Sequence, residues 1–273
     1  MGIVNINDDS FCNDGTLDGN AALTQAIRMA EEGADVVDVG AESARTNREA
    51  ISIDEEIARL HPFLTSISKA LENSKPRDSE QVWPPLISVN TWRPEVVEAV
   101  LPFGVDILND IGGLTETNNA TLCAAHDTAL LIMHTVGLPK VPHFQKQYED
   151  IWSELLTFFD QRITQATQCG LTKEQLILDP GIDFAKQCED NLKIYAQLDR
   201  LTTRYESPVL LPISRKTVIS DVLDLPNPND RDAGTVACLV AGIRRGVHLF
   251  RVHNVAAMFE VMKVLWAVES QRV

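Results

Sequence analysis

Short runs of apolar and β-branched residues recur along the whole chain, separated by longer stretches that mix apolar and polar positions. The runs cover residues 3–6, 35–39, 86–89, 106–108, 129–133, 176–178, 209–213 and 249–252. Their length and composition predict eight strands. Because the runs are apolar at consecutive positions, both faces of each strand are expected to be buried, which favours a parallel sheet covered by helices.

The stretches between the runs carry apolar residues at helical spacing. Leu23, Ile27 and Ala30 share one face of the first stretch. A second begins with Ser52 and has Glu55 three residues later, the pattern of a capping box. Strand followed by helix, repeated eight times, predicts a (β/α)8 TIM barrel of eight parallel strands with outer helices. Residues 1–273 are sufficient for one such domain.

Charge and cysteine content exclude several classes of protein. The chain has 39 acidic and 24 basic residues, a formal net charge of -15. This charge argues against a nucleic acid or an anionic membrane as partner. The five cysteines are scattered without Cys-x-x-Cys spacing, and neither a basic leader nor a membrane-length apolar run is present. We expect a cytoplasmic protein with reduced thiols.

Polar residues stand at or just after the end of every predicted strand. In chain order they include Asn5, Asp38, Asn90, Asn109, His134, Asp179, Ser214 and Arg251. Any one of them could simply cap a helix or form a turn. Because all eight strands end in this way, and because barrel enzymes bind substrates at the carboxyl ends of their strands, a polar pocket is the better interpretation.

The charges at this predicted rim suggest a ligand with an anionic part and a planar part. The candidate anion-binding residues are Arg45, Arg215, Lys216, Arg251 and His253. Asp179 could accept hydrogen bonds from two donors of a planar heterocycle, or it could be a buried partner of Lys216 without a ligand role. His134 is interpreted as a hydrogen-bonded core residue rather than a catalyst.

Taken together, these segments resemble the dihydropteroate synthase family over nearly the whole chain. The matching segments are residues 1–5 with 9–11, 33–40 with Glu42, Ser43 and Arg45, 87–89 with Thr91, 109–111, 133–134, 178–182 with Phe184, 214–216 and 251–253. The resemblance implies condensation of 6-hydroxymethyl-7,8-dihydropterin diphosphate with p-aminobenzoate, giving 7,8-dihydropteroate and diphosphate in folate biosynthesis. It also implies a cytoplasmic homodimer, inhibition by sulfonamides, and Mg²⁺ carried on the diphosphate.

The resemblance assigns roles to individual residues of this chain. Asp179, Asn109, Lys216, Asn90 and Phe184 would bind the pterin. Asn5, Arg45, Arg251 and His253 would bind the diphosphate, with Asn5 also contacting the metal. Ser214, Phe11 and Arg45 would form the p-aminobenzoate site, and Arg251, His253, Lys216 and Arg45 would carry the catalysis.

The chain also departs from the pattern of the family. Asn90 replaces the Asp expected after the third strand, and Ala44 replaces the Thr expected before Arg45. Asp183 and Ala185 replace glycines that follow Asp179, and Pro212 replaces the glycine before the Ser214–Lys216 segment. These changes motivate one alternative, a pterin-binding paralogue without catalysis. A methyltetrahydrofolate methyltransferase is a weaker alternative, because it would not need Arg251 and His253 to hold diphosphate.

Overall fold

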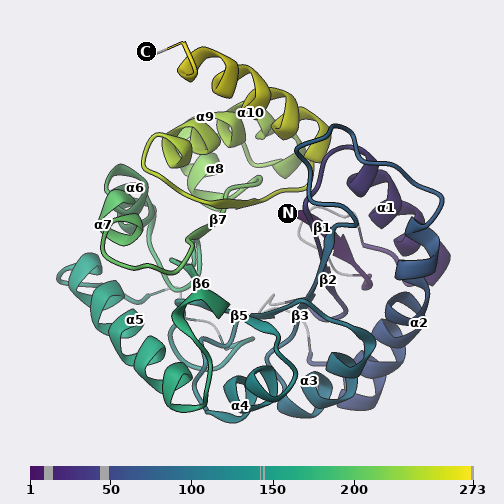
Figure 1. Cartoon of the computed structure of the whole chain (residues 1–273). Coiled ribbons are helices and arrows are strands. Elements are labelled where there is room, and N and C mark those ends of the chain that lie inside the picture. Colours follow the sequence, from purple (N-terminus) through teal and green to yellow (C-terminus); the bar gives the residue numbers. More distant parts are fainter. Residues whose placement is uncertain (9–14, 44–48, 142, 144, 272–273) are drawn as a thin grey trace.

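The strands form an inner ring and the helices form an outer one (Figure 1), in a computed structural model that describes residues 1–8, 15–43, 49–141, 143 and 145–271. The strands are β1 (Gly2–Asn5), β2 (Val36–Gly40), β3 (Leu86–Asn90), β4 (Ile107–Asp110), β5 (Ala129–Met133), β6 (Leu176–Asp179), β7 (Leu210–Pro212) and β8 (Leu249–Arg251). All eight predicted strands are therefore confirmed, within one or two residues at their ends.

Parallel pairing closes the ring. Strands β1 to β6 form one parallel sheet in chain order, and β7 pairs in parallel with β8. Single parallel bridges join the two sheets at both seams, Gly2 with Val252 and Leu178 with Val209. A backbone hydrogen bond of 2.9 Å from Leu178 to Pro208 supports the second seam. The predicted TIM barrel is thus confirmed.

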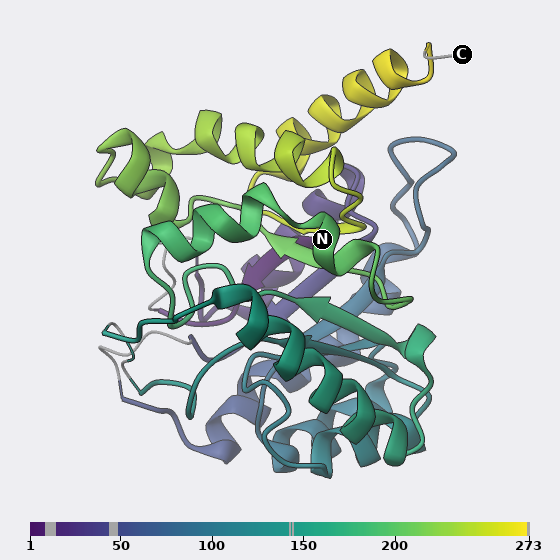
Figure 2. The ribbon, with the colours of Figure 1, turned by 90° about the vertical axis from the view of Figure 1, so that its left-hand side faces the viewer.

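The helices surround the strands on all sides, as both ribbon views show (Figures 1 and 2). They are α1 (Gly19–Glu31), α2 (Ile53–Leu71), α3 (Pro94–Val100), α4 (Asn118–Ala125), α5 (Ile151–Gln168), α6 (Cys188–Ala196), α7 (Asp199–Thr202), α8 (Thr217–Leu223), α9 (Asp232–Ile243) and α10 (Val255–Glu269). Short 3₁₀ turns lie at η1 (Leu101–Phe103), η2 (Lys173–Gln175) and η3 (Pro228–Asp230). The end of α10 projects away from the ring (Figure 2).

The start of α2 shows how the local sequence sets a helix boundary, and it corrects one prediction. The hydroxyl of Ser52 accepts a hydrogen bond of 3.1 Å from the backbone N–H of Glu55, so Ser52 is the N-cap. Glu55 does not complete the predicted capping box. Its carboxylate instead pairs with Arg59, one turn further along the helix, where an i,i+4 pair can form.

Alternation along the strands divides the core in two. Residues such as Val37, Leu108 and Leu178 face the helices in one large apolar cluster. A smaller cluster fills the barrel interior and contains Val36, Ile107, Leu131, Met133, Ile177 and Leu210. Since side chains alternate with a period of two, Asp38, two residues beyond Val36, also faces inward. The same spacing turns Asn5, Asn90, Asn109, Asp179, Ser214 and Arg251 into the barrel, above its apolar floor. His134 follows the inward-facing Met133 and faces the helices, where it contacts Phe158.

Candidate active site

Asp38 stands at the centre of a buried hydrogen-bond network inside the barrel. Its carboxylate is fully buried and accepts a 2.6 Å bond from the Ser88 hydroxyl and a 3.2 Å bond from the Asn109 amide. Arg251 Nε donates to the same carboxylate over 2.8 Å. The network therefore joins β2, β3, β4 and β8. A buried carboxylate with a guanidinium and two neutral donors is well compensated for its loss of water.

No role was predicted for Asp38, although it lies near the end of a predicted strand. The available signal was an acidic residue at an inward position of an otherwise apolar run. A charged group is placed there only at a large desolvation cost unless it has partners from other strands. Those partners, Ser88 and Arg251, are 50 and 213 residues away in sequence, so sequence spacing alone could not identify them.

Three asparagines lie at one level of the sheet. Asn5 pairs in register with Gly40, Gly40 with Asn90, and Asn90 with Asn109. The side-chain oxygen of Asn90 is buried and has no hydrogen-bond partner among the described residues. A buried acceptor without a partner is costly and rare in folded proteins. Asn90 therefore offers an acceptor that a ligand with an N–H group can satisfy.

Asp179 ends β6 at a position that is only 4% exposed. One of its oxygens accepts a 2.7 Å bond from the backbone N–H of Gly181. Burial raises the pKa of Asp179 to about 6, against the opposing effect of the positive charges on Lys216, Lys186 and Arg251. The carboxylate can thus change its protonation near neutral pH.

Lys216 and Phe184, both predicted to bind the pterin, lie together beside this carboxylate loop. Lys216 Nζ donates to the backbone oxygen of Ile182 over 3.0 Å and lies 5.2 Å from the centre of the Phe184 ring. This places a cation on the face of an aromatic ring, an arrangement that is attractive in itself. The segments that follow the consecutive strands β6 and β7 contribute these residues.

Ser214 and His253 also meet, although the resemblance assigned them to different substrates. The Ser214 hydroxyl lies 2.8 Å from His253 Nδ1, and the backbone N–H of His253 donates to the same oxygen over 3.2 Å. Arg215 is held differently from the other cations of the predicted rim. Its guanidinium pairs with Asp232 over 2.9 Å and donates to the side chain of Asn229. Arg45 and Phe11 lie outside the described residues.

Lys186 is a residue that the sequence analysis missed. Its ammonium is buried, lies 2.8 Å from His134 Nδ1, and donates to the backbone oxygens of Gly181 and Phe184 over 2.9 and 3.0 Å. Burial lowers the pKa of Lys186 to about 7 and holds the pKa of His134 well below its usual value. His134 is fully buried, as expected of a core residue.

Glu42 links described residues on both sides of the segment 44–48 that follows β2. The carboxylate of Glu42 accepts hydrogen bonds from the backbone N–H of Ile51 over 3.1 Å and from Lys140 Nζ over 2.7 Å, and it pairs with Arg93. Glu42 and Ile51 stand near the two ends of the segment that contains Arg45 in sequence. The described ends of this loop are therefore held together by one buried carboxylate.

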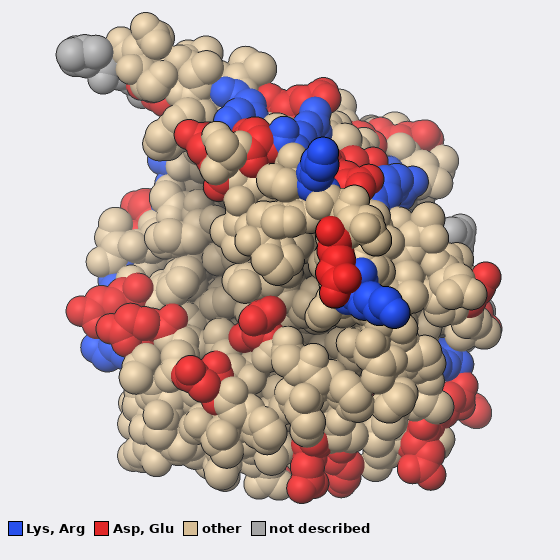
Figure 3. Space-filling model, turned by 45° about the vertical axis from the view of Figure 1, so that its right-hand side comes forward, with Lys and Arg blue, Asp and Glu red and all other residues tan. Residues whose placement is uncertain are grey.

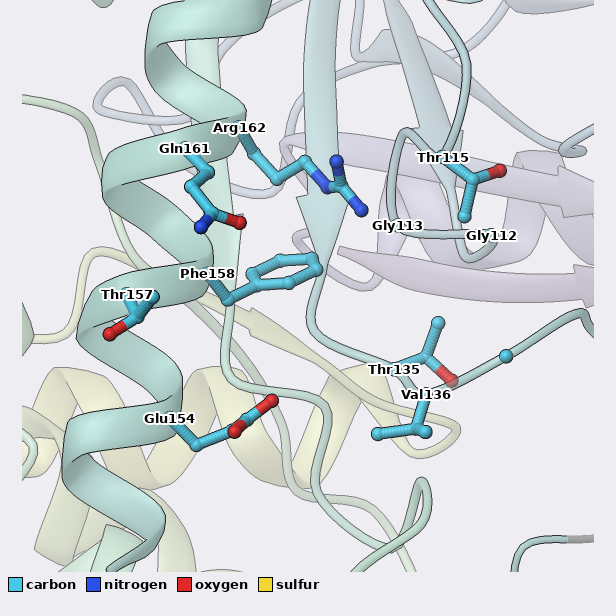
Figure 4. Close-up of a pocket in the computed structure, with 11 residues that line it drawn as sticks. Gly112, Gly113, Thr115, Thr135, Val136, Glu154, Thr157, Phe158, Gln161 and Arg162 are labelled. Atoms are coloured by element: carbon cyan, nitrogen blue, oxygen red, sulfur yellow. The ribbon is translucent and has the colours of Figure 1, made fainter.

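A separate cleft of about 270 Å³ lies between α5 and the loops after β4 and β5 (Figure 4). Thr115, Thr135, Phe158 and Arg162 are among its lining residues, and it contains none of the predicted site residues. The Arg162 guanidinium lies over the Phe158 ring and donates to Gln165 over 2.9 Å. Arg162 Nε is buried without a hydrogen-bond partner among the described residues.

Three other features would indicate a different class of site: a basic surface patch, a metal-binding cluster and a membrane-spanning helix. Acidic side chains are spread over the face shown in Figure 3, and the fewer basic ones form no continuous patch there. Within the described ranges, no group of three or more His, Cys, Asp or Glu side chains could hold a metal ion. No helix in the described part of the chain is long and apolar enough to span a bilayer.

Comparison with known proteins defines the class. The family model described as pterin binding enzyme matches residues 1–253. Dihydropteroate synthase of Escherichia coli K12 is 34% identical over 273 residues, covering all of this chain and 92% of the relative. The crystal structure of Yersinia pestis dihydropteroate synthase with a sulfonamide drug complex superposes with a TM-score of 0.88 at 31% identity, covering 99% of this chain and 94% of that one.

A structure that contains a pteroate agrees with this result. Dihydropteroate synthase from Xanthomonas albilineans in complex with 7,8-dihydropteroate has a TM-score of 0.82 and 32% identity, covering 98% of this chain and 92% of that one. The barrel is thus that of a pterin-binding enzyme. The chain belongs to the dihydropteroate synthase family, whose activity, a transferase reaction of folate biosynthesis, is the one that the sequence predicted. These findings do not favour either alternative function.

Proposed function

We propose that this chain condenses 6-hydroxymethyl-7,8-dihydropterin diphosphate with p-aminobenzoate, using the residues inside the barrel mouth. The observation that carries the proposal is the bond between Arg251 and Asp38, because Asp38 also holds Asn109. A residue proposed for the diphosphate and a residue proposed for the pterin are thereby fixed relative to each other. Positioning of this kind lowers the barrier to a reaction between two bound parts.

The pterin ring would be held by acceptors at its amide and amine edge and by cations near its oxygen. Asp179 and the unpartnered oxygen of Asn90 supply acceptors, and Asn109 lies in register with Asn90. Lys216 and Phe184 offer a cation and an aromatic surface on one side of the site. Each of these groups is buried or half-buried, which strengthens its hydrogen bonds to a ligand.

Departure of diphosphate requires the protein to stabilise negative charge. The bond between the pterin methylene and the diphosphate oxygen breaks, and the electron pair leaves with the diphosphate. Arg251 keeps its remaining guanidinium N–H groups for these oxygens while Nε bonds Asp38. His253, placed by Ser214, would add a second donor. Donors that are fixed before the reaction begins are the most effective stabilisers of developing charge.

The new bond forms from the aniline nitrogen of p-aminobenzoate to the same methylene carbon. The attacking nitrogen then loses one proton to solvent, so the site needs no strong general base. A structural relative, the synthase of Xanthomonas albilineans, is described with 4-aminobenzoic acid. In this chain Ser214 supports the proposed p-aminobenzoate side through its contact with His253. Phe11 and Arg45 remain proposed contributors to the same side.

Mg²⁺ is proposed as the cofactor, carried by the substrate. Since the described residues contain no cluster of metal-binding side chains, the protein would supply few ligands. Mg²⁺ fits such a site, because it commonly uses one or two protein oxygens together with phosphate oxygens and water. Asn5, at the end of β1, has a side-chain amide oxygen of the required kind. The bound ion would neutralise charge on the leaving diphosphate.

The experiment that tests the function is detection of dihydropteroate by mass spectrometry. Purified protein is mixed with the pterin diphosphate and p-aminobenzoate, with Mg²⁺ in one sample and a chelator in the other. We expect product of the correct mass at a rate that depends on Mg²⁺. Pterin binding without product would instead support a non-catalytic paralogue, and equal rates in both samples would overturn the Mg²⁺ proposal.

We further propose a cytoplasmic homodimer. The four described cysteines, Cys123, Cys169, Cys188 and Cys238, are free thiols, which suits a reducing compartment. Helix α10 exposes Met262, Val264, Val268 and Trp266, the last with 71% of its surface accessible. Large apolar side chains grouped on one exposed helix support a contact with a second copy. Analytical ultracentrifugation should find a dimer that Trp266→Glu converts to monomers, and a monomeric wild type would overturn the proposal.

A further inference from the structure

Asp183 links the loop after β6 to the start of α8, and the functions described so far do not use this residue. Its carboxylate accepts hydrogen bonds from the backbone N–H groups of Thr217 and Val218, the latter over 3.3 Å. These are the first two residues of α8, and Lys216 precedes them directly. Since the first N–H groups of a helix have no partner within the helix, the carboxylate satisfies both and fixes the chain beside Lys216.

The Asp183 carboxylate is itself held from the opposite side. Asn191, which is 2% exposed in α6, donates from its amide nitrogen to Asp183 Oδ1 over 3.2 Å. In return, the backbone N–H of Asp183 donates to the Asn191 amide oxygen over 3.0 Å. A pair of reciprocal bonds to a buried side chain leaves Asp183 little rotational freedom. The carboxylate is therefore a fixed attachment point for α8.

The two segments hold each other in both directions. The side chain of Asp183 binds the backbone after Lys216, while the side chain of Lys216 binds the backbone oxygen of Ile182 over 3.0 Å. The same ammonium lies over the ring of Phe184. Residues 182–184 and 216–218 thus form one reciprocal unit, in which moving either segment displaces the Lys216 ammonium from the pterin side of the site.

The backbone of Asp183 gives independent evidence that this contact is maintained. Asp183 has φ +70°, in the left-handed region, where glycine is expected from the resemblance to the family. A residue with a side chain is disfavoured in this conformation and remains there when the surrounding contacts require it. Ala185 also has a positive φ, +51°, but lacks a side chain that could form hydrogen bonds. The two positions therefore separate the effect of the carboxylate from that of the conformation.

We propose that Asp183 is a positioning residue for pterin recognition, acting by holding Lys216 over Phe184. The inference rests on the proposed function of the site and adds a residue that this chain has in place of the glycine expected for the family. Asp183 itself does not contact the substrate. Its removal should weaken the binding of the pterin part and leave the p-aminobenzoate part nearly unchanged, because its contacts lie beside Lys216 and do not include Ser214, the described residue proposed for p-aminobenzoate.

The test compares Asp183→Gly, Asp183→Asn and Ala185→Gly with the wild type. Affinity for the pterin diphosphate is measured by calorimetry without the second substrate, and KM is measured for both substrates. Asp183→Gly should weaken pterin binding about tenfold, the effect of losing a helix cap near a ligand-binding side chain. Asp183→Asn, which keeps one acceptor oxygen and tolerates positive φ, should stay within about threefold of wild type. Ala185→Gly should bind like the wild type.

A double-mutant cycle with Lys216→Met shows whether Asp183 acts through Lys216. If it does, Asp183→Gly should have less than about a twofold further effect in the Lys216→Met protein, since coupled residues are not additive. Full additivity, or an unchanged pterin affinity in folded Asp183→Gly, would overturn the proposal. Because glycine favours this backbone conformation, thermal unfolding of that variant should remain cooperative. Wild-type protein that binds the pterin without turnover would overturn the synthase function alone. The pterin affinities of the Asp183 variants relative to wild type would still test the role of Asp183.

Discussion

The acidic and cationic parts of the barrel mouth differ in burial and in how they are held. Asp38, Asn109 and Asp179 lie within or at the end of strands of the continuous six-stranded sheet and are at most 4% exposed. Lys216 and Arg251 follow or end strands of the short β7–β8 pair and are half-buried. The acceptors thus lie on the continuous sheet, and the cations lie closer to solvent.

This difference follows from what each group must bind. A pterin edge is recognised by acceptors in fixed positions, and burial strengthens their hydrogen bonds at the cost of a raised carboxylate pKa. Diphosphate enters and leaves as a highly charged group, so its ligands need access to water. Arg251 belongs to both parts, since its Nε bonds the buried Asp38 while 22% of its side chain remains exposed. Changes at this contact should therefore have the largest effects.

Arg251→Ala should cause the greatest loss of activity. It removes the donor proposed for the leaving diphosphate and leaves the buried Asp38 carboxylate without its guanidinium partner. We expect turnover to fall at least about 10³-fold, and the protein to lose about 3 kcal/mol of unfolding free energy. Dihydropteroate formation and denaturant unfolding measure the two effects.

The matched control for this variant is Arg28→Ala, at an arginine whose side chain is 65% exposed and pairs with Glu32 within α1. It should change turnover and stability very little, because exposed pairs of this kind contribute little. An Arg251→Ala protein that retained wild-type turnover would contradict the division into acceptors and cations.

Asp38→Asn should have the next largest effect. The amide keeps the shape of the carboxylate and can still accept from Ser88, but it no longer attracts the Arg251 guanidinium. We expect kcat/KM to fall about 100-fold, as when one member of a buried charged pair is neutralised. Steady-state kinetics for the pterin diphosphate provide the measurement. Ser88→Ala, which removes one neutral donor from the same carboxylate, should cost less than about fivefold. Equal losses of kcat/KM in Asp38→Asn and Ser88→Ala would show that the charge of Asp38 is not the cause of the loss.

The pH dependence of pterin binding should report on Asp179. Its pKa is raised to about 6 by burial, so the carboxylate becomes protonated as pH falls from 7 to 5. Binding that needs the ionised form should weaken about tenfold per pH unit below the pKa. Calorimetric titrations of the pterin diphosphate at a series of pH values test this expectation.

Stability should change in the opposite direction. Because the folded-state pKa of Asp179 lies above its usual value of about 4, the folded protein binds more protons than the unfolded chain between these values. The contribution of Asp179 to the unfolding free energy therefore increases as pH falls from about 6 to about 4. Asp110 has a similar pKa, about 6, raised by burial. Asp179→Asn should abolish the pH dependence of pterin binding, while the contribution of Asp110 to stability remains. If pterin binding by this variant still depended on pH in the same way, Asp179 would not be the cause of that dependence.

Periodicity and strand-end position predicted the barrel and the level of the site, because both depend on the two-residue alternation of strands. They could not predict the partners across the barrel. Asp38 depends on Arg251, more than 200 residues away, and Lys186 reaches His134 through a loop whose course the sequence does not encode locally. The resemblance supplied roles for positions at which this chain matches the family pattern. Asp183 was noted only as a departure from the expected glycine. Its function as a link became visible through its contacts with α8.

Asn90→Asp should have the smallest effect, and it addresses the acidic part of the site directly. The oxygen of Asn90 is buried without a partner, and the resemblance predicts Asp at this position. A carboxylate would bind a pterin N–H more strongly than an amide, since charge-assisted hydrogen bonds are stronger. Part of this gain is lost to the desolvation of another buried charge. We therefore expect KM for the pterin diphosphate to fall only about threefold, with kcat nearly unchanged. A rise in KM would show instead that the neutral amide suits an interior that already contains Asp38 and Asp179. The number of buried carboxylates, rather than the geometry of each, would then limit pterin affinity in this chain.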